Sequence, residues 1–510
     1  METFPIDGKS LTLEQVTLVS RRQSRAELAP AARARMSASR AVLEKLIAGG
    51  TAMYGVNTGF GKLKDVRIPP EKLTLLQENL IHSHCSGVGA SLPEETVRAI
   101  LLLRANTLAQ GPSAIRPEVV DTLLGMLAAD LLPEIPSQGS VCASGDLAPL
   151  AHLALAAMGE GEVRYRGELM PAAAAFRQAK LTPIRFGPKE GLSVINGTQV
   201  ATAIGCLAAA RAGNLLACAD IAAAMSIETL RGSSAAFDER LHLMRPHRGQ
   251  IDTASNLRRL LADSGIMDSH RDCDRLQDSY ALRCVPQVHG AVRDTLRHIR
   301  SILKTEINSV TDNPILDPET EQILLGGNFH GAPIGYAMDF LAIAFTDLAS
   351  ISERRMERLL NPSLSGLPPF LAHDPGLQSG FMMAHVTAAG LVSENKGLAH
   401  PASVDSIPTS AAQEDHVSMG NWAARKAMAI VENTERVVAI EILAAAQGID
   451  LLRPLAPARA LAAGHRFLRG QIPPLDGDRV LAGDIESAAA MIRNSGLRHC
   501  VEAVAGPILE

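Results

Sequence analysis

The chain has 510 residues and a formal net charge of −5 at pH 7, and 46% of its residues are hydrophobic. This apolar content excludes a disordered chain, and the mixed signs of its charges argue against a nucleic-acid-binding protein, which would carry a basic face or stripe. Aromatic residues make up only 3%, so we expect a core of packed helices rich in Ala and Leu.

Long helices are predicted along much of the chain. Apolar residues recur at helical spacing from Glu94 to Ala109 and from Glu118 to Leu132, with Gly and Pro near the ends. Three longer helices are predicted at Val200 to Leu230, Ile334 to Leu360 and Trp422 to Ala446. The first is apolar nearly all round, which is typical of a buried helix. Its Arg211 and Asp220 argue against a membrane span.

Strand signals are few. The segment from Glu162 to Leu169 alternates in polarity around Gly167 and predicts a small hairpin. The expected fold is therefore mainly α, a bundle of long helices with little β structure. The length suggests about two to four domains. We divide the chain into an N-terminal region, residues 1–199, and a central and C-terminal helical region, residues 200–510.

Six irregular segments rich in Gly, Asn, Gln, Ser and Thr lie between the helices. They are residues 54–61, Gly139 to Ala151, Asn196 to Gln199, Gln277 to Gly290, Gly326 to Pro333, and Ser410 to Met419. Any one of them would ordinarily be a simple turn. Because rigid helices that present polar loops form many active sites, six such segments together predict a site.

The second of these segments contains the tripeptide Ala143-Ser144-Gly145. Such small residues usually serve only to turn a chain. If the backbone bends tightly, however, the Gly145 nitrogen can attack the Ala143 carbonyl carbon, because glycine has no side chain to shield it. Loss of the Ser144 hydroxyl as water then gives an imidazolone with an electrophilic exocyclic alkene. The tripeptide thus predicts an electrophile made from the chain itself.

This segment resembles the signature of the ammonia-lyases and aminomutases that use 4-methylidene-imidazol-5-one (MIO). The resemblance runs from Tyr54 to Met419 with the motifs in the family's order, and within the family it is strongest to the histidine ammonia-lyases. It implies a fold of the ammonia-lyase/fumarase-like type, a homotetramer with shared active sites, and no external cofactor. It also implies the non-oxidative deamination of histidine to trans-urocanate and ammonia, the first step of histidine degradation.

The resemblance also implies roles for single residues. Tyr54, in YGVNTGFG, matches the family's catalytic tyrosine, whose phenolate takes the substrate's β-proton. Arg283, in QDSYALRC, matches the residue that pairs with the substrate carboxylate, which a planar guanidinium suits. Further residues match groups that orient substrate and cofactor: Gln277, Tyr280, Asn196 in INGTQ and Phe329 in GGNFH. The resemblance implies that Tyr280 is also a catalytic residue.

Substrate choice is expected to depend on three motifs. Ser83-His84 matches the pair of the histidine enzymes, where phenylalanine and tyrosine enzymes typically carry Phe-Leu or His-Leu. Glu414, in QEDHVSM, matches an acid where phenylalanine enzymes tend to carry an amide. A histidine and a carboxylate together can hydrogen-bond both nitrogens of an imidazole. Met382, in GFMMAH, matches a methionine that lines the ring pocket.

Several positions depart from the family's usual pattern. They are Cys142 in place of Gly, Ala412 in place of Asn, His385 in place of Gln, Ser279 in place of Pro, and His82 as an additional imidazole. None removes a catalytic group, but Ala412, His82 and His385 are positions that can reshape the pocket. Tyrosine or phenylalanine ammonia-lyase and 2,3-aminomutase activities therefore stay as alternatives within the family.

Two other classes of function are weaker hypotheses. The fifteen histidines allow a metal-dependent hydrolase, but His82-Ser83-His84 is the one close pairing and the sequence has no HExxH motif. A catalytically silent helical scaffold is the other, and the joint presence of Tyr54, Ser144 and Arg283 argues against it.

Cysteine usage suggests where the protein acts. The seven cysteines are odd in number and none is spaced as CxxC, and the first residues include Glu2 and Asp7 without an apolar segment. We therefore expect reduced thiols, a cytoplasmic location, and a small-molecule substrate without a nucleic-acid or membrane partner.

Overall fold

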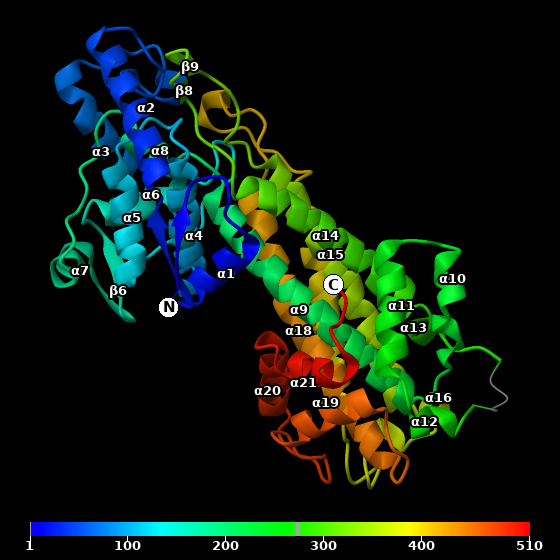
Figure 1. Ribbon diagram of the computed structural model, residues 1–510. Coiled ribbons are helices and arrows are strands. Elements are labelled where there is room, and N and C mark those ends of the chain that lie inside the picture. Colours follow the sequence, from blue (N-terminus) through cyan, green and yellow to red (C-terminus); the bar gives the residue numbers. More distant parts are fainter. Residues whose placement is uncertain (1, 272–275) are drawn as a thin grey trace. The chain divides into compact units, whose positions relative to one another are not determined.

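The computed structural model describes residues 2–271 and 276–510, and helices dominate it (Figure 1). No strand in these ranges is longer than five residues, which confirms the predicted mainly α fold. The chain forms two compact units. Unit 1 comprises Met1–Leu207, Arg300–Asp339 and Pro401–Arg425, and unit 2 comprises Ala208–Ile299, Phe340–His400 and Lys426–Glu510. The predicted N-terminal region lies within unit 1, whereas residues 200–510 are divided between both units.

Four long helices each contribute residues to both units: α9 (Gln199–Thr229), α14 (Val285–Glu306), α15 (Ala332–Leu360) and α18 (Gly420–Leu451). Two of them, α9 and α15, are long and apolar enough to cross a membrane. The most apolar window of α9 is 83% buried inside the protein and that of α15 is 61% buried. The sequence predicted all of these except α14, and α9 is the buried helix that its all-round apolar pattern indicated.

Helix α4 (Glu94–Ala109) is almost entirely buried within unit 1, and it matches its predicted bounds. It packs against α1, α2, α5 and α8, and every residue from Thr96 to Ala109 is buried. Glu94 and Glu95 occupy its first turn, where the helix dipole favours negative charge. The other helices of unit 1 are α1 (Leu13–Ser20), α2 (Pro30–Ala48), α3 (Leu73–His84), α5 (Pro117–Ala129), α6 (Leu147–Ala157), α7 (Ala172–Ala179) and α8 (Glu190–Ile195).

The second predicted helix is shorter than expected at its C-terminal end. Helix α5 begins with Pro117 at its first position, which suits a residue with a fixed φ and no N–H to donate. It ends because Asp130 adopts a left-handed φ of 60°. Leu131 and Leu132, which were expected to extend the helix, instead belong to strand β4 (Leu131–Pro133).

The strands form small separate sheets. The predicted hairpin is confirmed as β6 (Glu162–Tyr165) paired with β7 (Glu168–Pro171). Its two turn residues, Arg166 and Gly167, both have positive φ, as a tight hairpin turn requires. The remaining pairs are parallel β1 (Glu2–Ile6) with β2 (Ser24–Leu28), and antiparallel β3 (Val88–Ser91) with β5 (Pro136–Gln138), β4 with β6, and β8 (Ile315–Asp317) with β9 (Gln322–Leu324).

Unit 2 contains one segment that was predicted wrongly from the sequence. Gln277 to Gly290 was expected to be irregular, but most of it is helical, as α13 (Tyr280–Arg283) and the start of α14. The polar residues of this segment made its apolar helical face hard to recognise in the sequence. That face continues along α14, where Val292, Leu296 and Ile299 are buried. The other helices are α10 (Glu239–Leu243), α11 (Arg248–Leu260), α12 (Gly265–Asp268), α16 (Pro362–Ser365), α17 (Met382–Leu398), α19 (Arg459–Arg469), α20 (Ala482–Arg493) and α21 (Gly496–Ala505).

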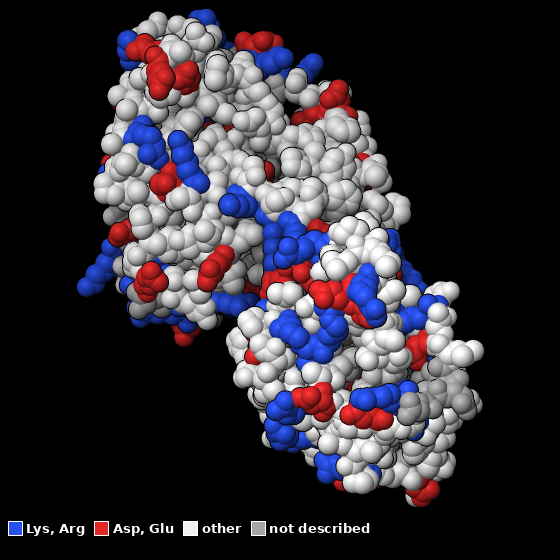
Figure 2. All heavy atoms as spheres, turned by 45° about the vertical axis from the view of Figure 1, so that its right-hand side comes forward, with Lys and Arg blue, Asp and Glu red and all other residues white. Residues whose placement is uncertain are grey.

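Short 3-10 helices complete the structure: η1 (Gly61–Leu63), η2 (Pro70–Lys72), η3 (Ser234–Phe237), η4 (Pro369–Leu371) and η5 (Ser410–Ala412). On the face drawn in Figure 2, Lys and Arg are interspersed with Asp and Glu. On this face the charges are therefore mixed in sign, as they are along the sequence.

Candidate active site

The tripeptide Ala143-Ser144-Gly145 lies in the tight turn that precedes α6. Gly145 has a φ of 72° and forms a bridge to Gly197, and the Asp146 N–H donates to the Gly197 carbonyl oxygen at 2.7 Å. A Cβ atom on Gly145 would lie 2.1 Å from that same oxygen. Glycine is thus required here both by the backbone conformation and by the close approach of the two chain segments.

The side chain of Asp146 fixes this turn by hydrogen bonds. Its buried carboxylate accepts hydrogen bonds from Ser140 Oγ at 2.9 Å, from the Ala201 N–H at 2.8 Å and from Asn421 Nδ2 at 3.2 Å. Burial raises the pKa of Asp146, although these donors lower it. The carboxylate therefore connects the turn to the first residues of both α9 and α18.

Ala143 and Ser144 line a cavity of about 980 Å³ that is built from residues of unit 1. Eight of the predicted site residues line it: Tyr54, Ser83, His84, Ala143, Ser144, Asn196, Phe329 and Glu414. Gly145 lies directly behind them, against Gly197. The fold therefore brings together motifs that are separated by up to several hundred residues in the sequence.

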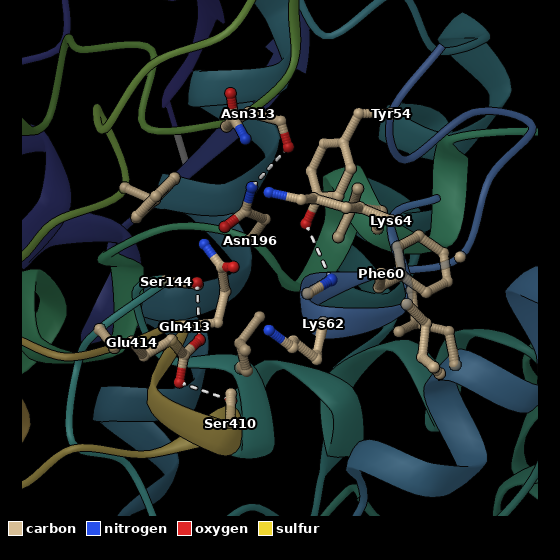
Figure 3. Close-up of a pocket in the computed structure, with 18 of the residues that line it drawn as sticks. Tyr54, Phe60, Lys62, Lys64, Ser144, Asn196, Asn313, Ser410, Gln413 and Glu414 are labelled. Carbon is tan, nitrogen blue, oxygen red and sulfur yellow. Dashed lines mark hydrogen bonds between the residues drawn. The ribbon is translucent and has the colours of Figure 1, made fainter. Parts of the chain in front are cut away.

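Tyr54 projects into the cavity from the first polar loop (Figure 3). Its hydroxyl oxygen accepts a hydrogen bond from the Gly61 N–H, at the start of η1, at 3.2 Å. Lys62 and Lys64 follow in the same segment and also line the cavity. The Gly61 N–H thus fixes the position of the phenol oxygen in the cavity.

Glu414 is held in one orientation by three hydroxyl groups. Ser144 Oγ donates to its Oε1 at 3.0 Å, while Thr409 Oγ1 and Ser410 Oγ donate to its Oε2 at 2.7 and 2.9 Å. Figure 3 shows Ser144 and Ser410 on either side of this carboxylate. The side chain is thus fixed directly beside the serine whose hydroxyl must leave if the tripeptide cyclises.

The Ser83-His84 pair ends α3 at the edge of the cavity. Ser83 Oγ donates to the Leu80 carbonyl oxygen at 3.0 Å and lies 3.0 Å from His84 Nδ1. Burial lowers the pKa of His84, although Leu80 and Glu414 raise it. A neutral imidazole is therefore favoured, and Nδ1 donates to the hydroxyl when it carries the ring proton.

Asn196 lies at the end of α8 and lines the same cavity as Tyr54 (Figure 3). Its Nδ2 donates to Asp312 Oδ1 at 3.2 Å and to the Asn313 carbonyl oxygen at 2.9 Å. Its Oδ1 is buried and has no hydrogen-bond partner in the described part of the chain. This oxygen can accept a hydrogen bond from a group bound in the cavity.

The remaining predicted site residues belong to unit 2, and none of them lines this cavity. Tyr280 and Arg283 lie on α13, where the guanidinium carbon is 4.6 Å from the centroid of the Tyr280 ring. Tyr280 is 71% exposed, and Arg283 Nε has no partner in the described ranges. Gln277 precedes α13, and Met382 begins α17.

The departures from the family pattern stay outside the cavity. His82 pairs with Glu160 at 2.8 Å, His385 pairs with Glu353 at 2.7 Å in unit 2, and neither lines the cavity. Ala412 and Ser279 also do not line it. Cys142 is buried next to the tripeptide, so none of these five residues lines the cavity of unit 1.

Several lining residues were not predicted from the sequence. They are Lys62, Lys64, Asn313, His330, Gln413 and His416. The rings of His330 and His416 stack with centroids 5.9 Å apart. Most of these six lining residues lie in or close to a predicted motif. Asn313 does not, because no residue pattern around it indicated a site. Among the described residues, no group of three or more His, Cys, Asp or Glu side chains is arranged to hold a metal ion.

Residues 11–470 match the aromatic amino acid lyase family. The match covers most of the chain and includes every motif that forms the cavity, so the chain belongs to this family. A histidine ammonia-lyase of Anaeromyxobacter sp. (strain K) is 53% identical to it over 506 residues, which cover 98% of this chain and 100% of the relative. The family predicted from the motifs is thereby confirmed.

Two solved structures share the fold over nearly the whole chain. Histidine ammonia-lyase from Trypanosoma cruzi superimposes with a TM-score of 0.92 at 44% identity, covering 99% of this chain and 96% of the other. Tyrosine aminomutase from Streptomyces globisporus superimposes with a TM-score of 0.93 at 38% identity, covering 100% and 99%. Fold alone therefore does not distinguish the reactions within the family.

Proposed function

We propose that the protein catalyses the non-oxidative deamination of L-histidine to trans-urocanate and ammonia, the first step of histidine degradation. The observation that carries this proposal is the position of His84 and Glu414 in one cavity with Ser144. An imidazole and a carboxylate together can hydrogen-bond both nitrogens of a histidine ring. The histidine ammonia-lyases among its relatives support the same substrate.

We infer that Ala143-Ser144-Gly145 forms the electrophile MIO without an external cofactor. The Gly145 nitrogen bonds to the Ala143 carbonyl carbon, whose oxygen leaves as water with the amide hydrogens of Gly145 and Ser144. The Ser144 hydroxyl then leaves as a second water with the hydrogen on its Cα. The positive φ of Gly145, its contact with Gly197, and the hydrogen bond from Ser144 Oγ to Glu414 support this route.

The residues of the cavity have distinct roles in the proposed reaction. When formed, MIO supplies an electrophilic alkene that makes the substrate's amine a better leaving group. Tyr54 takes the β-proton as a phenolate, and the N–H of Gly61 stabilises that negative charge. His84 and Glu414 hold the imidazole ring, and Phe329 and Asn196 border the reacting carbons.

We propose further that the protein is a homotetramer whose subunits share active sites. The cavity of unit 1 contains two lysines but no arginine among its described lining residues. Arg283 and Tyr280 form a pair with an exposed ring and an unpartnered Nε. A partner subunit that brings this pair to the cavity, together with Gln277 and Met382, supplies the clamp for the substrate carboxylate.

We propose that the protein acts in the cytoplasm and needs no nucleic-acid or membrane partner. The six cysteines in the described part of the chain are free thiols, as is usual in a reducing compartment. Cys273 lies outside the described residues.

The test is an ultraviolet assay of product formation with histidine, tyrosine and phenylalanine. We expect urocanate from histidine, at a catalytic efficiency that exceeds those on the other two, and unchanged activity after strong chelation. Faster turnover of tyrosine or phenylalanine would overturn the choice of histidine. A β-amino-acid product, detected by chromatography, would identify a 2,3-aminomutase instead.

A further inference from the structure

Gly145 contacts Gly197, and the turn that contains Gly197 is supported by residues on its other side. Gly197 lies between α8 and α9, where its carbonyl oxygen accepts from the Asp146 N–H at 2.7 Å. Its φ is 147°. The position of the Gly145 nitrogen relative to the Ala143 carbonyl carbon therefore depends on how rigidly the Asn196-Gly197 turn is supported.

Arg104 of α4 supports that turn directly. It is fully buried, and its Nη1 donates to the Asn196 carbonyl oxygen at 2.8 Å and to Gln199 Oε1 at 2.5 Å. A Cβ atom on Gly197 would lie 2.5 Å from the same Nη1, so the guanidinium packs tightly against the turn. Gln199 is fixed in turn by donating to Thr107 and Thr311.

The placement of this arginine is costly, because burial disfavours its charged form and lowers its pKa to about 10, although Asp312 raises it. Nε and Nη2 are buried without hydrogen-bond partners in the described ranges. Both of its hydrogen bonds there go to the Asn196 carbonyl and to Gln199. A buried cation that satisfies so few of its own donors gains little for stability, which points to a role in shaping the turn.

The side chain of Asn196 is held by a second buried group. Lys189 Nζ donates to Asp312 Oδ2 at 2.8 Å, and the other oxygen of Asp312 accepts from Asn196 Nδ2 at 3.2 Å. Both Lys189 and Asp312 are completely buried. Arg104 thus holds the backbone of the turn, whereas the Lys189–Asp312 pair holds the side chain of Asn196.

We propose that Arg104 is a positioning residue for the cyclisation of Ala143-Ser144-Gly145, acting through the Asn196-Gly197 turn. This inference rests on the proposed function, because it presupposes that the tripeptide cyclises. The guanidinium holds the Asn196-Gly197 turn in contact with Gly145. This contact keeps the Gly145 nitrogen within reach of the Ala143 carbonyl carbon. Loss of the guanidinium slows formation of the electrophile before any substrate is bound.

The experiment measures the intact mass of the purified full chain, in which cyclisation removes two water molecules. Arg104→Met is compared with Arg104→Lys, which keeps one donor for the Asn196 carbonyl. The matched control is Arg98→Met, on the same helix α4. Arg98 is also buried, but it hydrogen-bonds Val19, Leu127 and Asp130, away from the turn. Thermal unfolding and circular dichroism are recorded for every variant.

We expect wild type and Arg98→Met to be fully cyclised, Arg104→Met to retain mainly the uncyclised mass, and Arg104→Lys to recover several-fold more cyclised chain than Arg104→Met. Full cyclisation of Arg104→Met overturns the inference. So does an equal loss in Arg98→Met at an equal loss of thermal stability, which would indicate a general folding effect. If Arg104→Met does not fold, a folded Arg104→Lys that is cyclised less completely than wild type and Arg98→Met supports the inference, and one that is cyclised as completely as wild type overturns it. An uncyclised wild type overturns the proposed function instead.

Discussion

At the scale of single residues, the phenol of Tyr54 is the group that we assign to proton abstraction. It enters the cavity from a loop and accepts an N–H from Gly61 at 3.2 Å. A positioned general base contributes about 10²–10⁴-fold to a rate. We expect Tyr54→Phe to lower kcat by about 100-fold or more while KM changes only a few-fold, as measured by steady-state kinetics on histidine.

The control for this variant is Tyr165→Phe, because Tyr165 is buried in strand β6 and does not line the cavity. Its kcat is expected to equal that of the wild type. If Tyr54→Phe kept kcat within a few-fold of wild type, the base would have to be another residue.

Ring recognition depends on Ser83, His84 and Glu414. A site that hydrogen-bonds a polar ring rejects an apolar analogue by about 10⁴-fold, because its own buried groups then go unpaired. We expect histidine to exceed phenylalanine in kcat/KM by about that factor. The combined change Ser83→Phe, His84→Leu and Glu414→Gln is expected to shrink this preference by orders of magnitude, chiefly through lost histidine activity.

A neighbouring imidazole provides the control for ring recognition. His82→Leu removes a side chain that pairs with Glu160 and does not line the cavity. It should leave the ratio of kcat/KM on histidine to that on phenylalanine unchanged. An unchanged ratio in the triple variant, or a large change in His82→Leu, would show that the ring is recognised elsewhere.

Sequence motifs predicted Ser83, His84, Glu414, Tyr54 and Ser144 as site residues, because each lies in a pattern whose chemistry is specific. Lys62 and Lys64 were missed, since lysines in a loop usually face solvent. Asn313 was missed because it reaches the cavity only through tertiary folding. The contacts that bring these residues into one site, such as the hydrogen bond from Ser144 Oγ to Glu414, join positions as far as 270 residues apart.

At the scale of elements, the turn below the tripeptide is packed against the start of α15. A Cβ atom on Gly331 would lie 2.3 Å from Cys142 Sγ and 2.8 Å from Ser418 Oγ. Cys142 has a φ of 53°, a conformation that glycine adopts freely. We expect Gly331→Ala to displace Cys142 and to reduce the cyclised fraction, as read from intact mass.

Replacing Cys142 as well should relieve the shorter of these two contacts. The double variant Cys142→Gly/Gly331→Ala removes the Sγ atom, and we expect it to recover most of the cyclised chain that Gly331→Ala loses. Gly327→Ala is the control in the same loop, because a Cβ atom there meets nothing within 4 Å. The absence of recovery in the double variant would show that the steric conflict lies elsewhere.

Helix existence was predictable where one periodicity extended over many residues, as in α4 and α9. The boundaries of the helices were less predictable. The end of α5 depends on the left-handed conformation of Asp130, which no apolar pattern indicates. The start of α14 was hidden because the polar residues of the segment Gln277 to Gly290 outnumbered the buried ones that face the core.

At the scale of the whole molecule, the stability of unit 2 should depend on pH through Glu228 of α9. Burial raises the pKa of Glu228 from 4.5 to about 7, although donors from Ser264 and Ala458 lower it. The folded chain therefore holds this proton more tightly than the unfolded chain does. The stabilisation is complete below the unfolded pKa and is lost as pH rises through the folded pKa.

We expect Glu228→Gln to remove this dependence on pH. Relative to pH 5, the wild type should lose up to about 3 kcal/mol of unfolding free energy by pH 8, at 1.36 kcal/mol per pKa unit, and the variant much less. Denaturant unfolding at several pH values measures it, with the exposed Glu168→Gln in β7 as control. A pH slope that is the same in wild type and Glu228→Gln would contradict the assignment.

Shared active sites predict complementation between two inactive variants. Tyr54→Phe disables the cavity of unit 1, whereas Arg283→Ala removes the carboxylate clamp and should cost about 30-fold or more in kcat/KM. If a site takes Tyr54 from one subunit and Arg283 from a partner, random mixing of the two chains restores an intact pair at roughly a quarter of the sites. Co-expression with two different affinity tags isolates the mixed oligomers for assay. Their kcat/KM should far exceed that of either parent, whereas sites that take both residues from one chain would show no recovery at any mixing ratio.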